Sequence, residues 1–262
     1  MNVEPNNKPT VIKVGGSTLE DTGTTFQDIA TRTKNGEQIV VVHGGGPEAS
    51  QWLKKMDIES RFENGLRVTD EKVLPVVTAV YAGLINKRLV EALNNEGVQA
   101  VGLSGLDGEI ITSNINNQAL GYVGEPNQVN PKLLRTLFES GYTPVISPIS
   151  FAITNGQRKT VNVNADSIAS ILAIALEAKK LLFLTDTDGV SDSNQERIPI
   201  ISEDASLDLI ANGIISGGMI PKVQACLAVV REGVQAQIVD GQRAGILLNL
   251  ADQGTSFEIK SG

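Results

Sequence analysis

The chain has 262 residues, of which 41% are hydrophobic and 20% are charged, an ordinary globular composition with enough length for one large domain or two fused lobes. The net charge of -8 works against nonspecific binding to nucleic acid or to an anionic membrane, because both need clustered lysine and arginine. No apolar run approaches the roughly 18 residues that span a bilayer, and the first ten residues lack the pattern of a secretory signal, so we expect a cytoplasmic protein without nucleic-acid or membrane partners.

Short β-branched runs alternate along the chain with longer segments of helical periodicity. The runs predict strands at residues 11–14, 39–42, 98–103, 144–147, 181–185 and 236–239. The amphipathic segments predict helices at residues 70–94, 130–140, 165–178 and 219–232. This alternation predicts an α/β fold with a mostly parallel central sheet and helices on both faces.

Two segments interrupt this order, at residues 109–123 and 151–163. Both are richer in Asn, Gln, Gly and Thr, and their polar and apolar residues alternate as they do in hairpins. We expect them to form flaps beside a binding site. No linker separates two domains, so we expect two lobes on one continuous sheet, with residues 1–178 in the first and 179–262 in the second.

The first and second predicted strands both end in glycine turns, KVGGS at residues 13–17 and HGGGP at residues 43–47. Ligands bind at the carboxyl ends of strands in open α/β sheets, where glycines let backbone N–H groups approach phosphate oxygens. Neither turn matches the P-loop or the dinucleotide pattern, and either one alone could be an ordinary tight turn. Lys13 favours anion binding, because an unpaired ammonium inside an apolar strand would be costly and a bound anion would compensate it.

The single histidine and the single cysteine are interpreted as structural. His43 is at the end of a predicted buried strand, where an imidazole more often satisfies a neighbouring backbone group than takes part in catalysis. Cys226 lies in a periodic apolar stretch typical of the core, and one cysteine cannot form an internal disulfide. Because the sequence has no His or Cys cluster, we predict no metal ligation by protein side chains.

Six segments, in this order along the chain, resemble the amino acid kinase family. They are IKVGGS at residues 12–17, HGGGP at 43–47, NGLRVTD at 64–70, VNVNAD at 161–166, LTDTDGV at 184–190 and GGMIPKV at 217–223. The match is closest to members that act on N-acetylglutamate. The resemblance implies a three-layer αβα sandwich, with residues 1–178 binding the acyl amino acid and forming a dimer and residues 179–262 binding ATP.

The resemblance also implies a reaction, the ATP-dependent phosphorylation of the side-chain carboxylate of N-acetyl-L-glutamate in arginine biosynthesis. Lys13 and Lys222 match the lysines that hold the transferring phosphoryl group from opposite sides. Asp166 matches the aspartate that orients them, although it could also cap the following helix. A carboxylate and a γ-phosphate repel by roughly 4 kcal/mol per charge pair at 4 Å with an effective dielectric constant near 20. The lysines, backbone amides and a Mg²⁺ carried by the ATP phosphates would neutralise these charges, and no general base is needed because the carboxylate is already ionised.

The remaining matched residues are assigned to the two substrates. Arg67 matches the arginine that binds the α-carboxylate, for which a guanidinium fork is suited, whereas without the resemblance it would be interpreted as a solvated loop residue. The expected acyl-substrate residues are Gly44, Gly45, Arg67 and Asn162. The expected nucleotide residues are Gly15, Gly16, Asp186, Asp188, Gly217, Gly218 and Met219. The sequence does not decide which aspartate of the 185–190 turn contacts the nucleotide.

Some residues differ from the family pattern or point elsewhere. After HGGGP the family commonly has a bulkier apolar residue and Asn, where this chain has Ala49 and Ser50. Residues 102–108, GLSGLDG, resemble the related kinase of lysine biosynthesis, which phosphorylates aminoadipate on an acidic carrier protein. The NGLRVTD segment looks more like the acetylglutamate enzymes, and a net charge of -8 disfavours binding to an acidic carrier protein. Both observations favour acetylglutamate as the substrate. A third alternative is a nucleotide-sensing module without catalysis, which the matched lysines and Asp166 disfavour.

Assembly is also predicted from the resemblance. Arginine-inhibited members of the family have a longer N-terminal helix that ties dimers into hexamers, whereas here about ten residues precede the first predicted strand. We therefore expect a homodimer without arginine control, with the helix at residues 70–94 at its interface.

Overall fold

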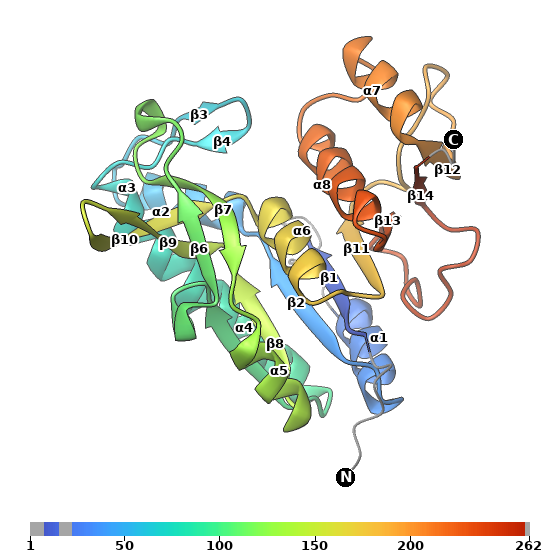
Figure 1. Cartoon of the computed structure of the whole chain (residues 1–262), viewed down its shortest axis with the longest axis horizontal. Coiled ribbons are helices and arrows are strands. Elements are labelled where there is room, and N and C mark those ends of the chain that lie inside the picture. Colours follow the sequence, from blue (N-terminus) through green and yellow to red (C-terminus); the bar gives the residue numbers. More distant parts are fainter. Residues whose placement is uncertain (1–7, 16–22, 260–262) are drawn as a thin grey trace.

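An eight-stranded sheet runs through the computed structural model, which describes residues 8–15 and 23–259 (Figure 1). The strand order is β12-β14-β13-β11-β1-β2-β8-β5. The six predicted strands are present and parallel to one another: β1 (Thr10–Val14), β2 (Ile39–His43), β5 (Ala100–Ser104), β8 (Thr143–Ser147), β11 (Lys180–Thr185) and β13 (Gln235–Asp240). Two short strands complete one edge, with β14 (Thr255–Glu258) antiparallel to β13 and β12 (Ile200–Ser202) beside it. The prediction of a mostly parallel sheet is confirmed.

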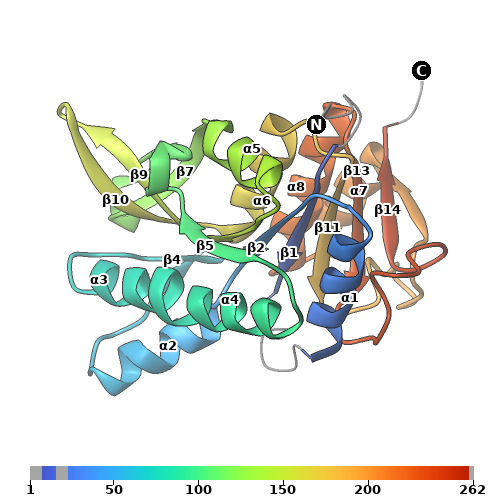
Figure 2. The ribbon, with the colours of Figure 1, turned by 90° about the horizontal axis from the view of Figure 1, so that it is seen from below.

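Helices cover both faces of the sheet and make the three αβα layers (Figure 2). On one face lie α5 (Lys132–Glu139), α6 (Ala165–Ala175) and α8 (Met219–Arg231), and on the other lie α1 (Gly23–Lys34), α2 (Gly46–Lys55) and a long helix from Val73 to Asn95. Alternate residues of each central strand enter two different cores. Val11 and Phe183 pack with the first set of helices, whereas Ile12 and Leu184 pack with the second. Burial on both faces explains why these strands are uninterrupted apolar runs in the sequence.

The predicted helix at residues 70–94 exists but is not uniform. It consists of α3 (Val73–Thr78), a π-helical segment η2 (Ala79–Ile85) and α4 (Asn86–Asn95). The 23-residue helix is long and apolar enough to cross a membrane by length and composition alone, a criterion that core helices also meet. Here Val77, Leu89 and Leu93 are buried in the core on this side of the sheet.

The two segments expected to form flaps belong to one small four-stranded barrel. In the first, β6 (Ile111–Asn114) pairs antiparallel with β7 (Val123–Val129). In the second, β9 (Ile149–Thr154) and β10 (Gln157–Val163) form a hairpin around Asn155 and Gly156, which both have positive φ. The hairpin prediction is confirmed for residues 151–163, whereas the first segment holds β6 and its partner β7 begins only at residue 123. The barrel lies over the end of the sheet where α6 begins (Figure 1).

In the described part of the chain, three α-helices were not predicted, namely α1, α2 and α7 (Glu203–Ala211). Each is short and has few apolar positions, so its periodicity is weak; α2, for example, buries only Ala49 and Leu53. Its first turn contains Pro47, which suits a position where no N–H is needed. This helix begins inside the HGGGP turn and so fixes the turn against the sheet.

Candidate active site

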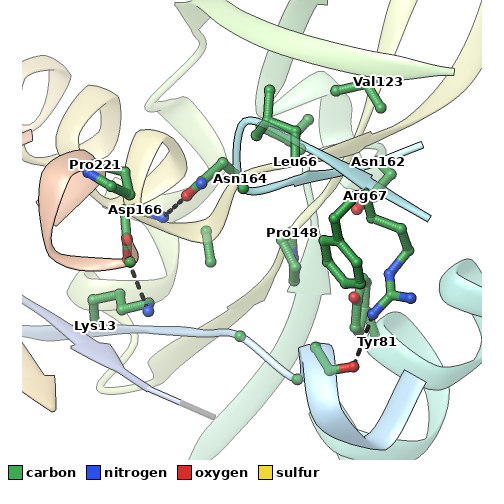
Figure 3. A pocket seen from close by; sticks show the side chains of 18 of the residues that line it. Lys13, Leu66, Arg67, Tyr81, Val123, Pro148, Asn162, Asn164, Asp166 and Pro221 are labelled. Atoms are coloured by element: carbon green, nitrogen blue, oxygen red, sulfur yellow. Dashed lines mark hydrogen bonds and ion pairs between the residues drawn. The ribbon is translucent and has the colours of Figure 1, made fainter. Parts of the chain in front are cut away.

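A cavity of about 300 Å³ opens at the carboxyl ends of β1, β2 and β8. Its walls come from segments far apart in the sequence: Lys13, Gly44–Pro47, Phe62, Gly65–Arg67, Tyr81, Val123, Pro148, Asn162–Asp166, Gly218, Pro221 and Lys222. Figure 3 shows Lys13, Asp166 and Pro221 at one end and Arg67, Tyr81 and Asn162 at the other. The cavity lies where parallel strands end, as the glycine turns predict.

Two lysines meet on one carboxylate at the first end of the cavity. Lys13 Nζ lies 2.8 Å from Asp166 Oδ1, and Lys222 Nζ lies 3.1 Å from Asp166 Oδ2. The lysines come from β1 and from the first turn of α8, while Asp166 comes from the first turn of α6. Lys13 is only 6% exposed, and Asp166 provides the counter-charge that its burial requires. The Lys13 ammonium thus has a protein partner in addition to the bound anion that the sequence predicts.

The charges in this cluster perturb one another. Burial lowers the pKa of Lys13 below its ordinary 10.5, and the Lys222 charge acts in the same direction, although Asp166 opposes both. Burial by itself would raise the pKa of Asp166, but the two ammonium groups outweigh it and hold that pKa below 3.8. Two cations and one anion therefore give this end of the cavity a net positive charge, which attracts anionic ligands.

Asn164, rather than Asp166, caps the helix that carries the shared carboxylate. Its side-chain oxygen accepts a hydrogen bond of 2.7 Å from the backbone N–H of Asp166. The capping interpretation of Asp166 is therefore wrong, and the Asp166 side chain is free to face the two lysines. Its place in the first turn of α6 also suits a negative charge.

Arg67 dominates the other end of the cavity and is 5% exposed, so it is not a solvated loop residue. Its Nη2 donates to Gly46 O at 2.8 Å and to Ser50 Oγ at 2.9 Å, its Nη1 donates to Ser60 Oγ, and its guanidinium stacks on the Phe62 ring. Ser50, which departs from the family pattern, thus supports the arginine. Among the described residues Nε has no partner, although it is buried. A buried donor without a partner fits an anionic ligand.

The expected substrate glycines form the turn between the two ends. The N–H of Gly44 donates to Val14 O at 3.2 Å and continues the sheet, so this amide is not free for an anion. Gly45 has φ +144°, and a Cβ there would overlap Ile85 Cδ1, so only glycine fits. Asn162 lines the cavity and donates to Thr69 Oγ1 at 3.1 Å.

Of the residues expected to bind the nucleotide, Gly218 lines the Lys222 end of the cavity. The N–H of Gly15 donates to Leu184 O at 3.1 Å, and Gly16 lies outside the described residues. Gly217 has φ +54°, and Gly218 precedes α8 and lines the cavity, so the N-terminus of this helix opens toward it. Met219 packs partly against the core. A helix N-terminus beside two lysines fits phosphate groups.

The two aspartates of the 185–190 turn differ in their contacts. Both are exposed and neither lines the cavity. Asp186 accepts from Thr185 Oγ1 at 3.1 Å, while Asp188 lies 3.4 Å from Arg197 Nε in an ion pair. Asp188 is therefore already engaged in holding its own loop.

His43 and Cys226 are structural, as expected. The fully buried His43 ring has Nδ1 2.8 Å from Gly44 O and Nε2 3.2 Å from Asn86 Nδ2. Burial lowers the pKa of His43 to about 4, and the charges of Lys13 and Lys87 contribute, so the ring is neutral at pH 7. Cys226 is buried in the core, and burial raises the pKa of its thiol.

Several cavity residues were missed in the sequence. Tyr81, Val123 and Pro148 lie in segments whose patterns indicate only a helix, a flap and a strand end. Tyr81 is the aromatic residue of an otherwise aliphatic helix, a weak signal that core packing explains equally well. The sequence alone does not show which side chains of these separate segments face the same cavity.

The chain is similar to known proteins along most of its length. The sequence model described as the amino acid kinase family matches residues 8–240. An acetylglutamate kinase of Dehalococcoides mccartyi is 42% identical over 254 residues, which cover 96% of this chain and 93% of the relative. An acetylglutamate kinase of Caldanaerobacter subterraneus is 44% identical over 250 residues, covering 92% and 83%. The crystal structure of smu.665 from Streptococcus mutans superposes with a TM-score of 0.84 at 27% identity, covering 95% of this chain and 98% of that one.

Proposed function

The chain belongs to the amino acid kinase family, and from that premise we propose that it transfers the γ-phosphoryl group of ATP to the side-chain carboxylate of N-acetyl-L-glutamate. The product is the acyl phosphate N-acetyl-L-glutamyl 5-phosphate, an intermediate of arginine biosynthesis. The observation that carries the proposal is the pair of ammonium groups on Asp166, in the same cavity as the buried guanidinium of Arg67.

In this reaction a carboxylate oxygen forms a bond to the γ-phosphorus, and the bond from that phosphorus to the bridging oxygen of ADP breaks. Lys13 and Lys222 hold the oxygens of the transferring group from two sides and offset the repulsion between the two anions. Each ammonium has three donors, so each can keep its bond to Asp166 while it binds an oxygen of the phosphoryl group. Asp166 keeps both lysines aimed at the same place.

At the other end of the cavity, Arg67 binds the α-carboxylate of the acyl amino acid, and its unpartnered Nε–H is one donor available for it. Gly44, Gly45 and Asn162 shape the pocket around the acyl amino acid. The Gly45 N–H has no hydrogen-bond partner in the described part of the chain, so it is the amide of this turn that we assign to an anion. These contacts place the side-chain carboxylate toward the lysines.

We assign the nucleotide to residues 179–262, with its phosphates at Gly217, Gly218, Met219 and the α8 N-terminus. We assign Gly15 and Gly16 to the nucleotide as well, from the resemblance of the first glycine turn to the family. Asp186 is the better candidate of the two turn aspartates for a nucleotide contact, because Asp188 is paired with Arg197. A Mg²⁺ bound through the ATP phosphates would supply further neutralisation of charge, and the net positive cluster and helix N-terminus fit the phosphates.

The assembly that we propose is a cytoplasmic homodimer. β5 is an edge strand of the sheet, and Tyr142 beside it is 39% exposed, so this side offers a surface that a second copy can cover together with the long helix. Light scattering would give twice the monomer mass, unchanged by arginine. A monomer, or a hexamer that responds to arginine, would contradict the proposed assembly.

A hydroxylamine-trapping assay tests the proposed reaction. Purified protein receives ATP and Mg²⁺ with N-acetylglutamate, free glutamate, aspartate or N-acetyl-aminoadipate in parallel reactions. We expect acyl hydroxamate from N-acetylglutamate alone. Acyl phosphate formed only from N-acetyl-aminoadipate would instead support the lysine-pathway alternative, and none from any substrate would contradict the enzyme assignment.

A further inference from the structure

Tyr81 is a wall residue of the cavity to which the proposed reaction gives no role. It belongs to η2 (Ala79–Ile85), the π-helical interruption of the long helix, and its side chain is only 5% exposed. π-helical segments are uncommon and often occur at functional sites, because the wider turn changes which side chains face inward. Tyr81 is therefore a candidate functional residue, because it lies in this segment and lines the cavity.

The Tyr81 ring is held in one place by the glycine turn. A Cβ built on Gly45 would lie 3.2 Å from Tyr81 Cδ1 and 3.3 Å from Tyr81 Cε1, so the ring fits tightly over a backbone that has no side chain. Ile85, one turn further along η2, packs against the same glycine. The position of the phenol is therefore set by backbone contacts and does not need a ligand.

The phenol of Tyr81 lies beside the guanidinium of Arg67. Both side chains stand on the same wall of the cavity in Figure 3. Burial raises the pKa of Tyr81, whereas the positive charge of Arg67 acts in the opposite direction. The hydroxyl consequently keeps its proton at neutral pH and can act as a hydrogen-bond donor.

Three of the five N–H donors of Arg67 already form hydrogen bonds within the protein. Nη1 binds Ser60, and Nη2 binds Gly46 and Ser50, which leaves Nε without a partner in the described part of the chain. A guanidinium has five N–H donors, so the Nε–H and one Nη1–H remain for a ligand. A carboxylate accepts at about four lone-pair sites, so it can bind these two donors and still accept a third from the Tyr81 hydroxyl.

We propose that Tyr81 is a substrate-recognition residue whose hydroxyl joins Arg67 in binding the α-carboxylate of the acyl amino acid. The inference rests on the proposed function, because it concerns the substrate of that same site. It makes Tyr81 a specificity determinant for substrates with a carboxylate next to the acylated nitrogen. The transferring phosphoryl group at the lysine end is unaffected by it.

The test compares Tyr81→Phe with the unchanged enzyme on two substrates, N-acetylglutamate and 4-acetamidobutanoate, which is the same molecule without its α-carboxylate. Phenylalanine keeps the ring that packs on Gly45. For N-acetylglutamate we expect KM to rise on the order of tenfold, as for loss of a hydrogen bond to a charged group, with kcat and the KM for ATP unchanged. For 4-acetamidobutanoate we expect the two enzymes to have equal kcat/KM. Tyr142→Phe, which removes a hydroxyl outside this cavity, is the matched control and should behave as the unchanged enzyme.

The outcomes separate this inference from the proposed function. If the unchanged enzyme forms no acyl phosphate from N-acetylglutamate, the proposed function fails and the inference fails with it. If the unchanged enzyme is active but Tyr81→Phe has the same KM, only the role of Tyr81 is overturned. An equal loss of kcat/KM on both substrates would also overturn it, because that result indicates a general disturbance of the cavity.

Discussion

At the scale of single residues, the cluster of Lys13, Asp166 and Lys222 combines two different degrees of burial. The Lys13 and Asp166 side chains are 7% and 6% exposed, whereas the Lys222 side chain is 15% exposed and sits at the start of α8. Removing Lys13 would leave Asp166 with a single partner in a buried site. Because Lys222 is more exposed, substituting it should affect catalysis with less effect on folding than substituting Lys13.

Lys222→Ala should therefore abolish most turnover and leave the fold intact. Loss of one preorganised donor to the transferring group is expected to lower kcat by about a hundred- to a thousandfold. Thermal unfolding should occur within a few degrees of the unchanged protein. Lys54→Ala, at an exposed position on α2, is the control. A variant that retains full kcat would contradict the role of Lys222.

The lowered pKa of Lys13 predicts an early alkaline limit to activity. As the pH rises through that lowered pKa, the folded enzyme loses the Lys13 proton before an ordinary lysine would at 10.5. The cation that faces the phosphoryl group is then lost, and kcat/KM, which reports the free enzyme, should fall below pH 10.5. Lys13→Arg retains its charge, so any activity that it keeps should extend to higher pH. A kcat/KM that stays constant to pH 10.5 in the unchanged enzyme would contradict this prediction.

His43 gives a prediction that can be measured directly, because it is the single histidine of the chain. Its proton NMR signal should titrate with a midpoint of about 4 in the folded protein, below the ordinary 6.5. The folded state then binds fewer protons than the unfolded state between these values. The contribution of His43 to the free energy of unfolding should accordingly fall as the pH drops from 6.5 toward 4, by about 1.4 kcal/mol per pH unit. A midpoint near 6.5 would show that the ring is not buried and neutral as described.

At the scale of elements, the contact between the HGGGP turn and η2 sets the shape of the cavity. Gly45→Ala should destabilise the protein by roughly 1–3 kcal/mol, because the residue has φ +144° and its new Cβ would overlap Ile85 Cδ1. Gly83→Ala is the matched substitution, since Gly83 is exposed in η2 and a Cβ there meets nothing within 4 Å. Urea unfolding should separate the two variants. Equal stabilities would contradict the tight contact.

The parts of the fold that were predictable are those with strong local periodicity. The strands β1, β2 and β11 are buried on both faces, so they appear as continuous apolar runs in the sequence. The helices α1 and α2 were missed because a short helix on a large sheet needs few apolar residues. The π-helical segment was missed because its apolar pattern is compatible with an ordinary α-helix.

The site was predictable in a different way. Local patterns indicated glycine turns and a lysine inside a strand, but no periodicity connects Lys13 with Lys222 or Asp166. The order of six motifs supplied that connection, through resemblance to a family. Tyr81 and the partners of Arg67 lay beyond both kinds of signal, because they depend on how η2 and α2 pack in three dimensions.

At the scale of the whole molecule, the sheet divides into two halves that match the proposed lobes. Strands β12, β14, β13 and β11 come from residues 179–262, and strands β1, β2, β8 and β5 come from residues 1–178. β1 and β11 are neighbours at the boundary. Asp166 bridges that boundary, since Lys13 belongs to the first half and Lys222 to the second. The proposed reaction therefore places the transferring group at the boundary between the two proposed lobes.

The central claim is that two ammonium groups on one carboxylate hold the transferring phosphoryl group. A crystal structure with ADP, Mg²⁺, aluminium fluoride and N-acetylglutamate tests it most directly, because aluminium fluoride mimics the phosphoryl group in the transition state of transfer. We expect the Nζ atoms of Lys13 and Lys222 on two sides of the mimic, each at about 2.7–3.1 Å from a fluorine, with Asp166 still between them. A complex in which either ammonium stays out of contact with the mimic would contradict the account.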